Sequence, residues 1–266
     1  MPRIFYWNVN KKDVRTLVCD AVKDCHADAV VLLENSVTAA TMLTALREKV
    51  SDSFFCPRAV VGRFQVFSRD AALDLREVYW GDRVTIRRMH DAKGDLLLGA
   101  VHVVDKMNWD QANQQAQVQL LSAEVRRCEQ EFRNDRTVLI GDFNMNPFEQ
   151  AMNLPAGMNS MMTRKCVQAG SRIQQEKEYP FFYNPMWSLF GDRTSGPAGT
   201  YYHAVSSRGN YGWNMLDQVL VRPAAIDHFQ DVEIVVSAGD KSLQTHSGRP
   251  NRAVASDHFP LLLQLA

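Results

Sequence analysis

The chain has 266 residues, 45% of them apolar, which is enough for a globular protein with a sizeable core. Its 30 lysines and arginines balance 30 aspartates and glutamates, so the formal net charge is zero. This argues against a surface coated in basic charge for non-specific nucleic-acid binding, although a local basic groove stays open. Without a run of ~20 apolar residues or a recognisable signal peptide, we expect a soluble, cytoplasmic protein with no membrane span.

The first fifty residues alternate between strand-like and helix-like patterns. We predict a strand over 3–9, followed by a helix over 11–25 in which apolar residues recur at helical spacing. The continuous apolar run at 28–33 is typical of a strand buried on both faces, and a second helix is expected over 38–50. The chain is therefore expected to begin with the order β-α-β-α.

The middle of the chain indicates short strands followed by one long helix. The expected strands lie at 59–61, 64–68, 83–89 and 96–103, with a hairpin turn at 91–94. The long helix is predicted over 110–133, and it leads into a strand over 137–140.

Residues 156–214 show no regular pattern, although they hold much of the glycine, proline, tyrosine and tryptophan. A connection of this length is usually functional or disordered, and its aromatic content argues against disorder. Strands are expected again at 215–221, 232–236 and 259–265. Because no repeat and no clear linker divides the chain, we expect a single domain over 1–266, with two similar halves.

The five cysteines form no CxxC pair, and their odd number argues against a disulfide framework or a structural zinc site. Cys19, Cys25 and Cys128 fall within helical patterns, where we expect them to act as small buried hydrophobes.

Polar side chains stand at the ends of the predicted strands, and in chain order these are Asn8, Asn10, Glu34, His102, Asp142, Asn144, Asp217, Asp257 and His258. Taken singly, each has an ordinary explanation. Asn10 would cap a helix that starts at Lys11, with Asp13 completing a capping box. A lone Glu34 would be solvated in a loop, and a lone His102 would be a satisfied core histidine.

Together, these residues favour a ligand site, because strand ends and loops meet at one edge of an α/β sheet. Buried charges need partners or a metal, and an oxygen-rich set without cysteine suits Mg²⁺ or Mn²⁺ rather than zinc. Within Gly141-Asp-Phe-Asn144, a spacing of two would put Asp142 and Asn144 on one face of a strand, with Phe143 directed into the opposite layer.

The order of these motifs resembles the endonuclease/exonuclease/phosphatase (DNase I-like) superfamily. The motifs are Asn8 in Trp-Asn-Val-Asn, Glu34, His102 in Val-His-Val, Gly141-Asp-Phe-Asn144, Leu216-Asp-Gln-Val-Leu220 and Ser256-Asp-His258. The resemblance implies an α/β fold, a four-layer sandwich of two facing mixed β-sheets flanked by helices. It also implies a divalent-metal-dependent phosphoesterase whose nucleophile is water.

For the metal, the resemblance implies that Glu34 is the principal ligand of Mg²⁺ or Mn²⁺, with Asn8 and Asp257 completing or supporting the site. The chain departs from the pattern at Asn10, where several family members carry an acid. This weakens any site that needs an extra carboxylate, and favours Asn10 as a helix cap or an outer-shell group.

For catalysis, the resemblance implies that Asp142 orients the attacking water, and that Asn144 holds that water or a phosphate oxygen. His258 would donate to the phosphate or transfer a proton, and Asp217 would fix its tautomer. His102 would stabilise the charged transition state. These types suit the chemistry, because imidazoles titrate near neutral pH and a positioned carboxylate aligns water.

The substrate is expected to be read by loops. Tyr201, Tyr202, Arg208 and Trp213 could stack bases and contact phosphates. Arg249 and Arg252, just before the last motif, could hold flanking phosphates or enter a groove. The alternatives are aromatic packing of the loop and a solvated basic loop.

Our first hypothesis is a nuclease acting on DNA by in-line attack of an activated water on phosphorus, in endo or exo mode. The second is a phosphatase or phosphodiesterase of inositol phosphates, phospholipid headgroups or another small phosphoester. The third is a binding protein without catalysis. A nuclease predicts an open groove with stacking aromatics, whereas a phosphatase predicts a closed basic pocket around one headgroup.

Overall fold

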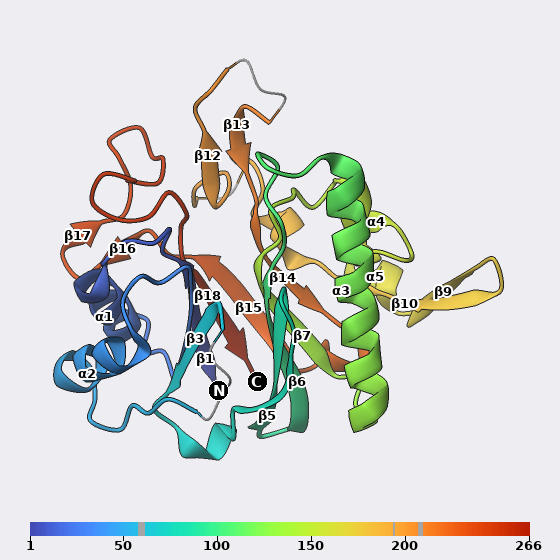
Figure 1. The fold of residues 1–266 in the computed structure, drawn as a ribbon, viewed down its shortest axis with the longest axis horizontal. Helices are drawn as coiled ribbons and strands as arrows, with labels where there is room; N and C mark the ends of the chain where they lie inside the picture. The colour runs from blue at the N-terminus through green and yellow to red at the C-terminus, as the bar shows by residue number, and fades with distance from the viewer. Residues whose placement is uncertain (58–61, 194, 207–209) are drawn as a thin grey trace.

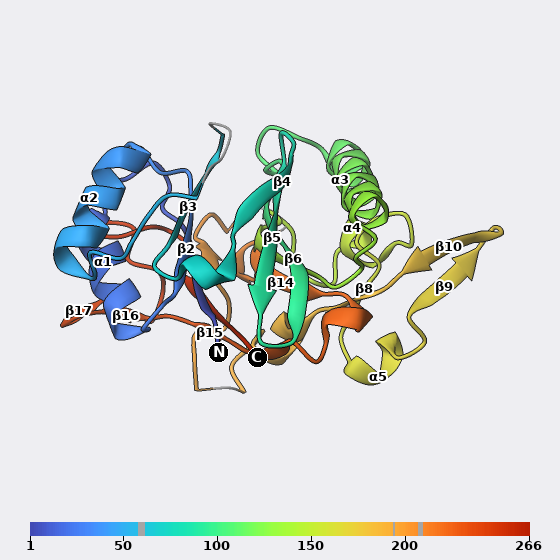
Figure 2. The ribbon, with the colours of Figure 1, turned by 90° about the horizontal axis from the view of Figure 1, so that it is seen from below.

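The computed structural model consists of two β-sheets that pack face to face, with helices on both outer sides (Figure 1). It describes residues 1–57, 62–193, 195–206 and 210–266. The predicted four-layer α/β sandwich of two mixed sheets is confirmed, and Figure 2 shows α1 and α2 on one side of the sheets and α3 on the other. The strand expected over 59–61 lies outside the described residues.

The first sheet has five strands in the order β15-β18-β1-β2-β3, with β1 and β2 parallel and the other pairs antiparallel. Its strands are β1 (Arg3–Asn8), β2 (Ala29–Leu33), β3 (Phe64–Ser68), β15 (Phe229–Ile234) and β18 (Leu261–Leu265). Helices α1 (Arg15–Asp24) and α2 (Ala39–Lys49) cover its outer face, where Phe5 and Trp7 pack against Val18 and Met42.

The second sheet has seven strands in the order β4-β5-β6-β7-β14-β11-β8. Its strands are β4 (Arg76–Trp80), β5 (Val84–Asp91), β6 (Gly94–His102), β7 (Thr137–Asp142), β8 (Ser160–Met161), β11 (Phe182–Tyr183) and β14 (Asp217–Val221). Helix α3 (Gln111–Phe132) covers its outer face, where Leu97 and Leu139 pack against Val118 and Leu121.

Short elements fill the connections. They are α4 (Gln150–Asn153), α5 (Arg164–Val167), β9 (Ser171–Gln174), β10 (Lys177–Pro180), β12 (Tyr201–His203), β13 (Gly212–Asn214), β16 (Ser237–Ala238) and β17 (Lys241–Ser242), with 3₁₀ turns at Ala71–Leu73, Pro185–Ser188 and Pro223–Ala225. The irregular stretch 156–214 therefore consists of short strands and turns. Both views show the β9–β10 hairpin projecting from the body (Figures 1 and 2).

The inner core lies between the sheets and positions the strand ends. Because side chains alternate along a strand, Ile4 and Tyr6 of β1 face inward, as does Ile140 of β7, and all three belong to the cluster between the sheets. Asn8 and Asp142 continue these inward rows at the last residue of each strand. The two polar residues therefore meet at the rim of the core, between the sheets.

The structure corrects several predicted boundaries. Helix α1 begins at Arg15 rather than near Lys11, and no side chain caps it, so the predicted Asn10 cap with Asp13 is wrong. Asn10 and Lys11 instead adopt left-handed conformations in the connection between β1 and α1. Strand β4 was not expected, because its residues are half-exposed and carry no clear apolar alternation.

The cysteines agree with the expectation in part. All five are free, and Cys19 and Cys128 are buried, whereas Cys25 is only partly buried. No helix in the described ranges is long and apolar enough to cross a membrane.

Gly141 is required by the close contact of β6 and β7. A Cβ at this position would lie 2.0 Å from the carbonyl oxygen of Val101, a backbone atom that cannot swing away. The glycine that precedes Asp142 thus lets the parallel strands pair up to the residue that enters the site.

We predict that Gly141→Ala lowers the free energy of unfolding by about 3 kcal/mol and the Tm by about 6–10 °C, because the added methyl group overpacks a rigid contact. The measurement is thermal unfolding followed by circular dichroism. Gly196→Ala is the matched control, since no described heavy atom lies within 4 Å of its Cβ position. Equal Tm values for the two variants would contradict the steric explanation.

Candidate active site

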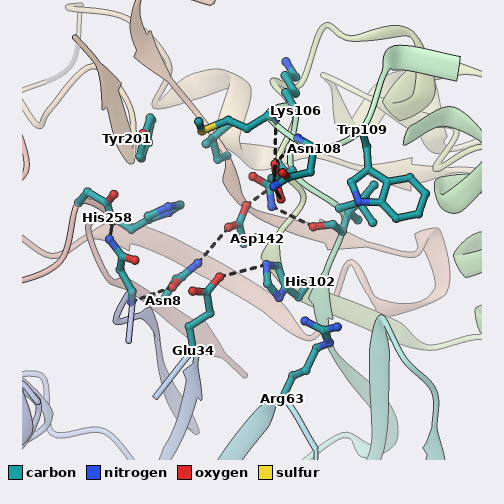
Figure 3. A pocket seen from close by; sticks show the side chains of 18 of the residues that line it. Asn8, Glu34, Arg63, His102, Lys106, Asn108, Trp109, Asp142, Tyr201 and His258 are labelled. Atoms are coloured by element: carbon teal, nitrogen blue, oxygen red, sulfur yellow. Dashed lines mark hydrogen bonds and ion pairs between the residues drawn. The ribbon is translucent and has the colours of Figure 1, made fainter. Parts of the chain in front are cut away.

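A cleft of about 620 Å³ opens at the end of the sandwich where β1, β2, β6 and β7 finish (Figure 3). The residues predicted from sequence that line it are Asn8, Asn10, Glu34, His102, Asp142, Asn144, Tyr201, Asp257 and His258. Asp217 lies fully buried beneath them, at the first residue of β14. The tertiary structure therefore brings the expected catalytic and metal-binding residues to one place.

Asp142 joins the two sheets. Its Oδ2 accepts a hydrogen bond from Asn8 Nδ2 at 3.0 Å, and its Oδ1 accepts one from the backbone N–H of Asn144 at 2.8 Å. Asp142 is 2% exposed. Burial raises the pKa of its carboxyl to about 7, although the positive charge of His258 lowers this pKa. A carboxylate in such a position is stabilised by a nearby positive charge.

His258 is held from below by Asp217. Its Nδ1 donates to Asp217 Oδ2 at 2.8 Å, and the Tyr6 hydroxyl donates to Asp217 Oδ1 at 3.1 Å. Burial opposes protonation of the imidazole, but the charge and hydrogen bond of Asp217, with Asp142 and Asp257, outweigh it and raise the His258 pKa to about 10. With Nδ1 engaged, Nε2 is the nitrogen left for a ligand in the cleft.

The loop that carries His258 is tied to β1. Trp7 Nε1 donates to the carbonyl of His258 at 2.8 Å, and Ser256 Oγ donates to the carbonyl of Asn8 at 2.6 Å. Asn10 Nδ2 donates to Asp257 Oδ1 at 2.9 Å. Asn10 thus orients Asp257 from the side.

Glu34 and His102 form the opposite wall. Glu34 follows β2 with a left-handed φ of 52°, and its Oε1 lies 3.4 Å from His102 Nε2. Burial, together with the charges of Arg63 and Arg83, lowers the pKa of His102 to about 4. His102 is therefore neutral near pH 7 and is a hydrogen-bonding group rather than a cation.

Asn144 lies in a turn after β7, and this turn, rather than the alternation of a strand, directs its side chain into the cleft. β7 ends at Asp142, and Asn144 is left-handed with φ 51°, so the predicted continuation of the strand through Asn144 is wrong. Its Nδ2 donates to the carbonyl of Val103 at 2.9 Å, which fixes the amide. Phe143 does point into the opposite layer, where it packs with the α3 side of the sheet.

The residues predicted to bind substrate divide into three groups. Tyr201 lines the cleft, with its ring 5.0 Å from that of His258. Tyr202, Trp213 and Arg249 pack together beside it, with the Arg249 guanidinium 3.8 Å from the Tyr202 ring and Trp213 stacked on Phe259.

Two arginines remain from that prediction. Arg252 is exposed and does not line the cleft, although its charge acts on the Tyr201 hydroxyl, whose pKa burial raises. Arg208 lies outside the described residues.

Several cleft residues were not predicted from the sequence. Among them are Lys11, Arg63, Arg83, Lys106, Asn108 and Trp109. Lys106, Asn108 and Trp109 belong to the loop between β6 and α3. Their position shortly after His102 is the sequence feature that could have indicated that they line the cleft. Tyr6 and Trp7 lie in the strand predicted over 3–9 and have no predicted role there, although buried Tyr and Trp usually seek a hydrogen-bond partner.

Two separate sets of residues could hold a cation. Asp142, Asp217 and His258 each offer a ligand atom, and these atoms lie within 4.8 Å of one another. In this set, however, both oxygens of Asp217 already accept hydrogen bonds. The other set, Glu34, Asn8 and Asp257, lines the cleft and supplies the carboxylate and amide oxygens that Mg²⁺ and Mn²⁺ prefer.

Comparison with known proteins gives a family and a fold. The model of the Endonuclease/Exonuclease/phosphatase family matches residues 5–258. No curated protein matches the chain in sequence with significance.

Among solved structures, the Bacteroides thetaiotaomicron mannosyl-6-phosphatase Bt3783 is 14% identical with a TM-score of 0.63, over 100% of both chains. The D. rerio TDP2 complexed with single strand DNA product is 15% identical with a TM-score of 0.59, over 100% of this chain and 98% of that one. The Neisseria 3′ phosphatase NExo bound to product DNA hairpin is 18% identical with a TM-score of 0.54, over 100% of both. At these identities the likeness concerns the fold alone.

We predict that Tyr6→Phe lowers kcat about tenfold with little change in KM, because loss of the hydrogen bond to Asp217 loosens the His258 ring, and tenfold corresponds to about 1.4 kcal/mol in the barrier. The assay is hydrolysis of bis(para-nitrophenyl) phosphate with Mn²⁺. Tyr79→Phe, a tyrosine of β4 that does not line the cleft, is the matched control. If both variants keep the wild-type kcat, Tyr6 does not position the hydrogen-bonded pair of Asp217 and His258.

Proposed function

The chain belongs to the endonuclease/exonuclease/phosphatase family of phosphoester hydrolases, and within it we propose a divalent-metal-dependent nuclease that hydrolyses DNA by in-line attack of water on phosphorus. One observation carries the proposal. Buried acids and imidazoles from both sheets meet at the floor of an open cleft, whose walls bear the cations Lys11, Arg63, Arg83 and Lys106. These cations can contact the phosphates of a nucleic-acid chain, and the floor supplies the groups of a hydrolytic site.

The donor set of the floor fits Mg²⁺ or Mn²⁺. Glu34 would be the principal ligand, with Asn8 and Asp257 beside it, and these oxygens suit hard cations. When bound, the cation would neutralise the diester and polarise a non-bridging oxygen. Its charge would also stabilise the ionised form of the buried Asp142 carboxylate.

The protein side chains then have separate tasks. Asp142, held on both oxygens by Asn8 and Asn144, accepts a proton from the attacking water and aligns it. His258, charged and fixed by Asp217, donates through Nε2 to a phosphate oxygen. The neutral His102 contributes a hydrogen bond from the opposite wall.

A small phosphoester is the second candidate, and the volume of about 620 Å³ favours it, because small-ligand pockets have this size. One structural relative is a mannosyl-6-phosphatase. Two others were solved with DNA, however, and the cleft of this chain is not closed around one headgroup. Through Lys106, Trp109 and Asn210 it shares its lining with a neighbouring aromatic cavity, as expected of a groove for a chain.

The proposal is tested with a panel of plasmid DNA, linear DNA, RNA, inositol phosphates and phosphodiester dyes, each with Mg²⁺ or Mn²⁺. We expect DNA hydrolysis by the wild type at least about 100-fold above Asp142→Asn and His258→Ala. If only a phosphomonoester is hydrolysed, the nuclease assignment is wrong and the site assignment stands. Equal background for all three proteins on every substrate would overturn both.

The position of the cation is tested by Mg²⁺ titration of activity and by Mn²⁺ calorimetry. We expect Glu34→Gln to raise the half-saturating metal concentration at least about tenfold, since it replaces a charged ligand. Asp217→Asn should mainly lower kcat, because it acts through His258. The reverse pattern would place the ion among Asp142, Asp217 and His258.

A further inference from the structure

A second cavity of about 530 Å³ adjoins the catalytic cleft. It lies between the N-terminus of α3, the loop after β7 and the β12–β13 hairpin, which stand together at the same end of the molecule (Figure 1). The two cavities share Lys106, Trp109 and Asn210 in their linings. Figure 3 shows Trp109 at the edge of the catalytic cleft, next to Lys106 and Asn108. A strand that enters the cleft can therefore continue into this cavity.

Exposed aromatic rings line the second cavity. Trp109 is 38% exposed, Phe148 is 56% exposed and Tyr211 is 54% exposed. Phe148 already stacks on Phe190, with ring centroids 6.0 Å apart and an interplanar angle of 14°. Single exposed aromatics are common on proteins, but three around one cavity beside an active site mark an interaction surface.

The frame under these rings is held by hydrogen bonds. Asn146 Nδ2 donates to Asn214 Oδ1 at 2.8 Å, and Asn146 Oδ1 accepts from the backbone N–H of Met215 at 2.8 Å. Gln114 Nε2 donates to the carbonyl of Val104 at 2.8 Å, which ties α3 to the loop of Trp109. The rings are thus presented on a fixed support, so that stacking on them does not require the frame to be ordered first.

We propose that this cavity is a stacking subsite for an unpaired nucleobase of the strand whose phosphate lies in the catalytic cleft. The proposal rests on the nuclease function and adds a preference for single-stranded or frayed DNA. Every base has a flat face that stacks on an aromatic ring, so the subsite is sequence-tolerant. In a duplex those faces are covered by neighbouring base pairs, and only an unpaired base can leave the stack to reach the rings.

The test separates the bases from the phosphates. Binding of a labelled ten-residue thymidine oligonucleotide is compared by fluorescence anisotropy with that of a tetrahydrofuran oligomer of equal length, which has the same phosphates and no bases. EDTA is present so that no diester is hydrolysed. We expect the wild type to bind the thymidine strand about tenfold more tightly, or about 1.4 kcal/mol. Phe148→Ala and Trp109→Ala should lose most of this preference.

Trp80→Ala is the matched control, because Trp80 of β4 is a comparably exposed aromatic, 51%, that does not line either cavity. It should keep the wild-type preference. Equal binding of both oligomers by the wild type, or an undiminished preference in Phe148→Ala, overturns the subsite. Because hydrolysis is measured separately with Mg²⁺, an intact DNA hydrolysis with no base preference overturns the subsite alone. Absence of DNA hydrolysis overturns the nuclease.

Discussion

Two buried carboxylates place the strongest constraint on the structure around the cleft. Asp142 and Asp217 are register partners on the antiparallel strands β7 and β14, and they are 2% and 0% exposed. Two buried carboxylates destabilise each other by charge repulsion unless cations and hydrogen-bond donors surround them. Tyr6, Asn8 and His258 supply donors to these acids from the opposite sheet or from the loop before β18. The site is thus built from groups that the two acids require.

The apolar core of the sandwich offsets the free-energy cost of burying these polar groups. In β1 and β7 the inward side chains belong to the core between the sheets, and only the last inward position, Asn8 or Asp142, lies outside this cluster. The strands that carry these positions are hydrogen-bonded to neighbouring strands on both edges, which keeps the acids from moving into solvent. The fold therefore stores a polar cluster at its rim, where a cation and a phosphate can complete the neutralisation.

Chemistry and selectivity are placed on different parts of the fold. The acids and imidazoles lie at strand ends or in the short segment before β18, whereas the exposed cations and aromatics that line the two cavities lie mainly in loops and in the β12–β13 hairpin. Loops can change without disturbing the core. This separation explains how solved structures that differ in their named activities can share this fold at 14–18% identity.

The sequence by itself determined the alternation of strands and helices and the polar residues at the strand ends, because these depend on local periodicity. The layered fold followed from the resemblance of its motifs to a known family. Only the tertiary structure decided the partners: that Tyr6 holds Asp217, that Asn10 orients Asp257 rather than capping a helix, and that Asn144 enters the cleft through a turn. It also decided that Trp109 and Phe148 line one cavity. Such contacts join residues far apart in the chain, and no local pattern records which side chains the packing of two sheets will bring within hydrogen-bonding distance.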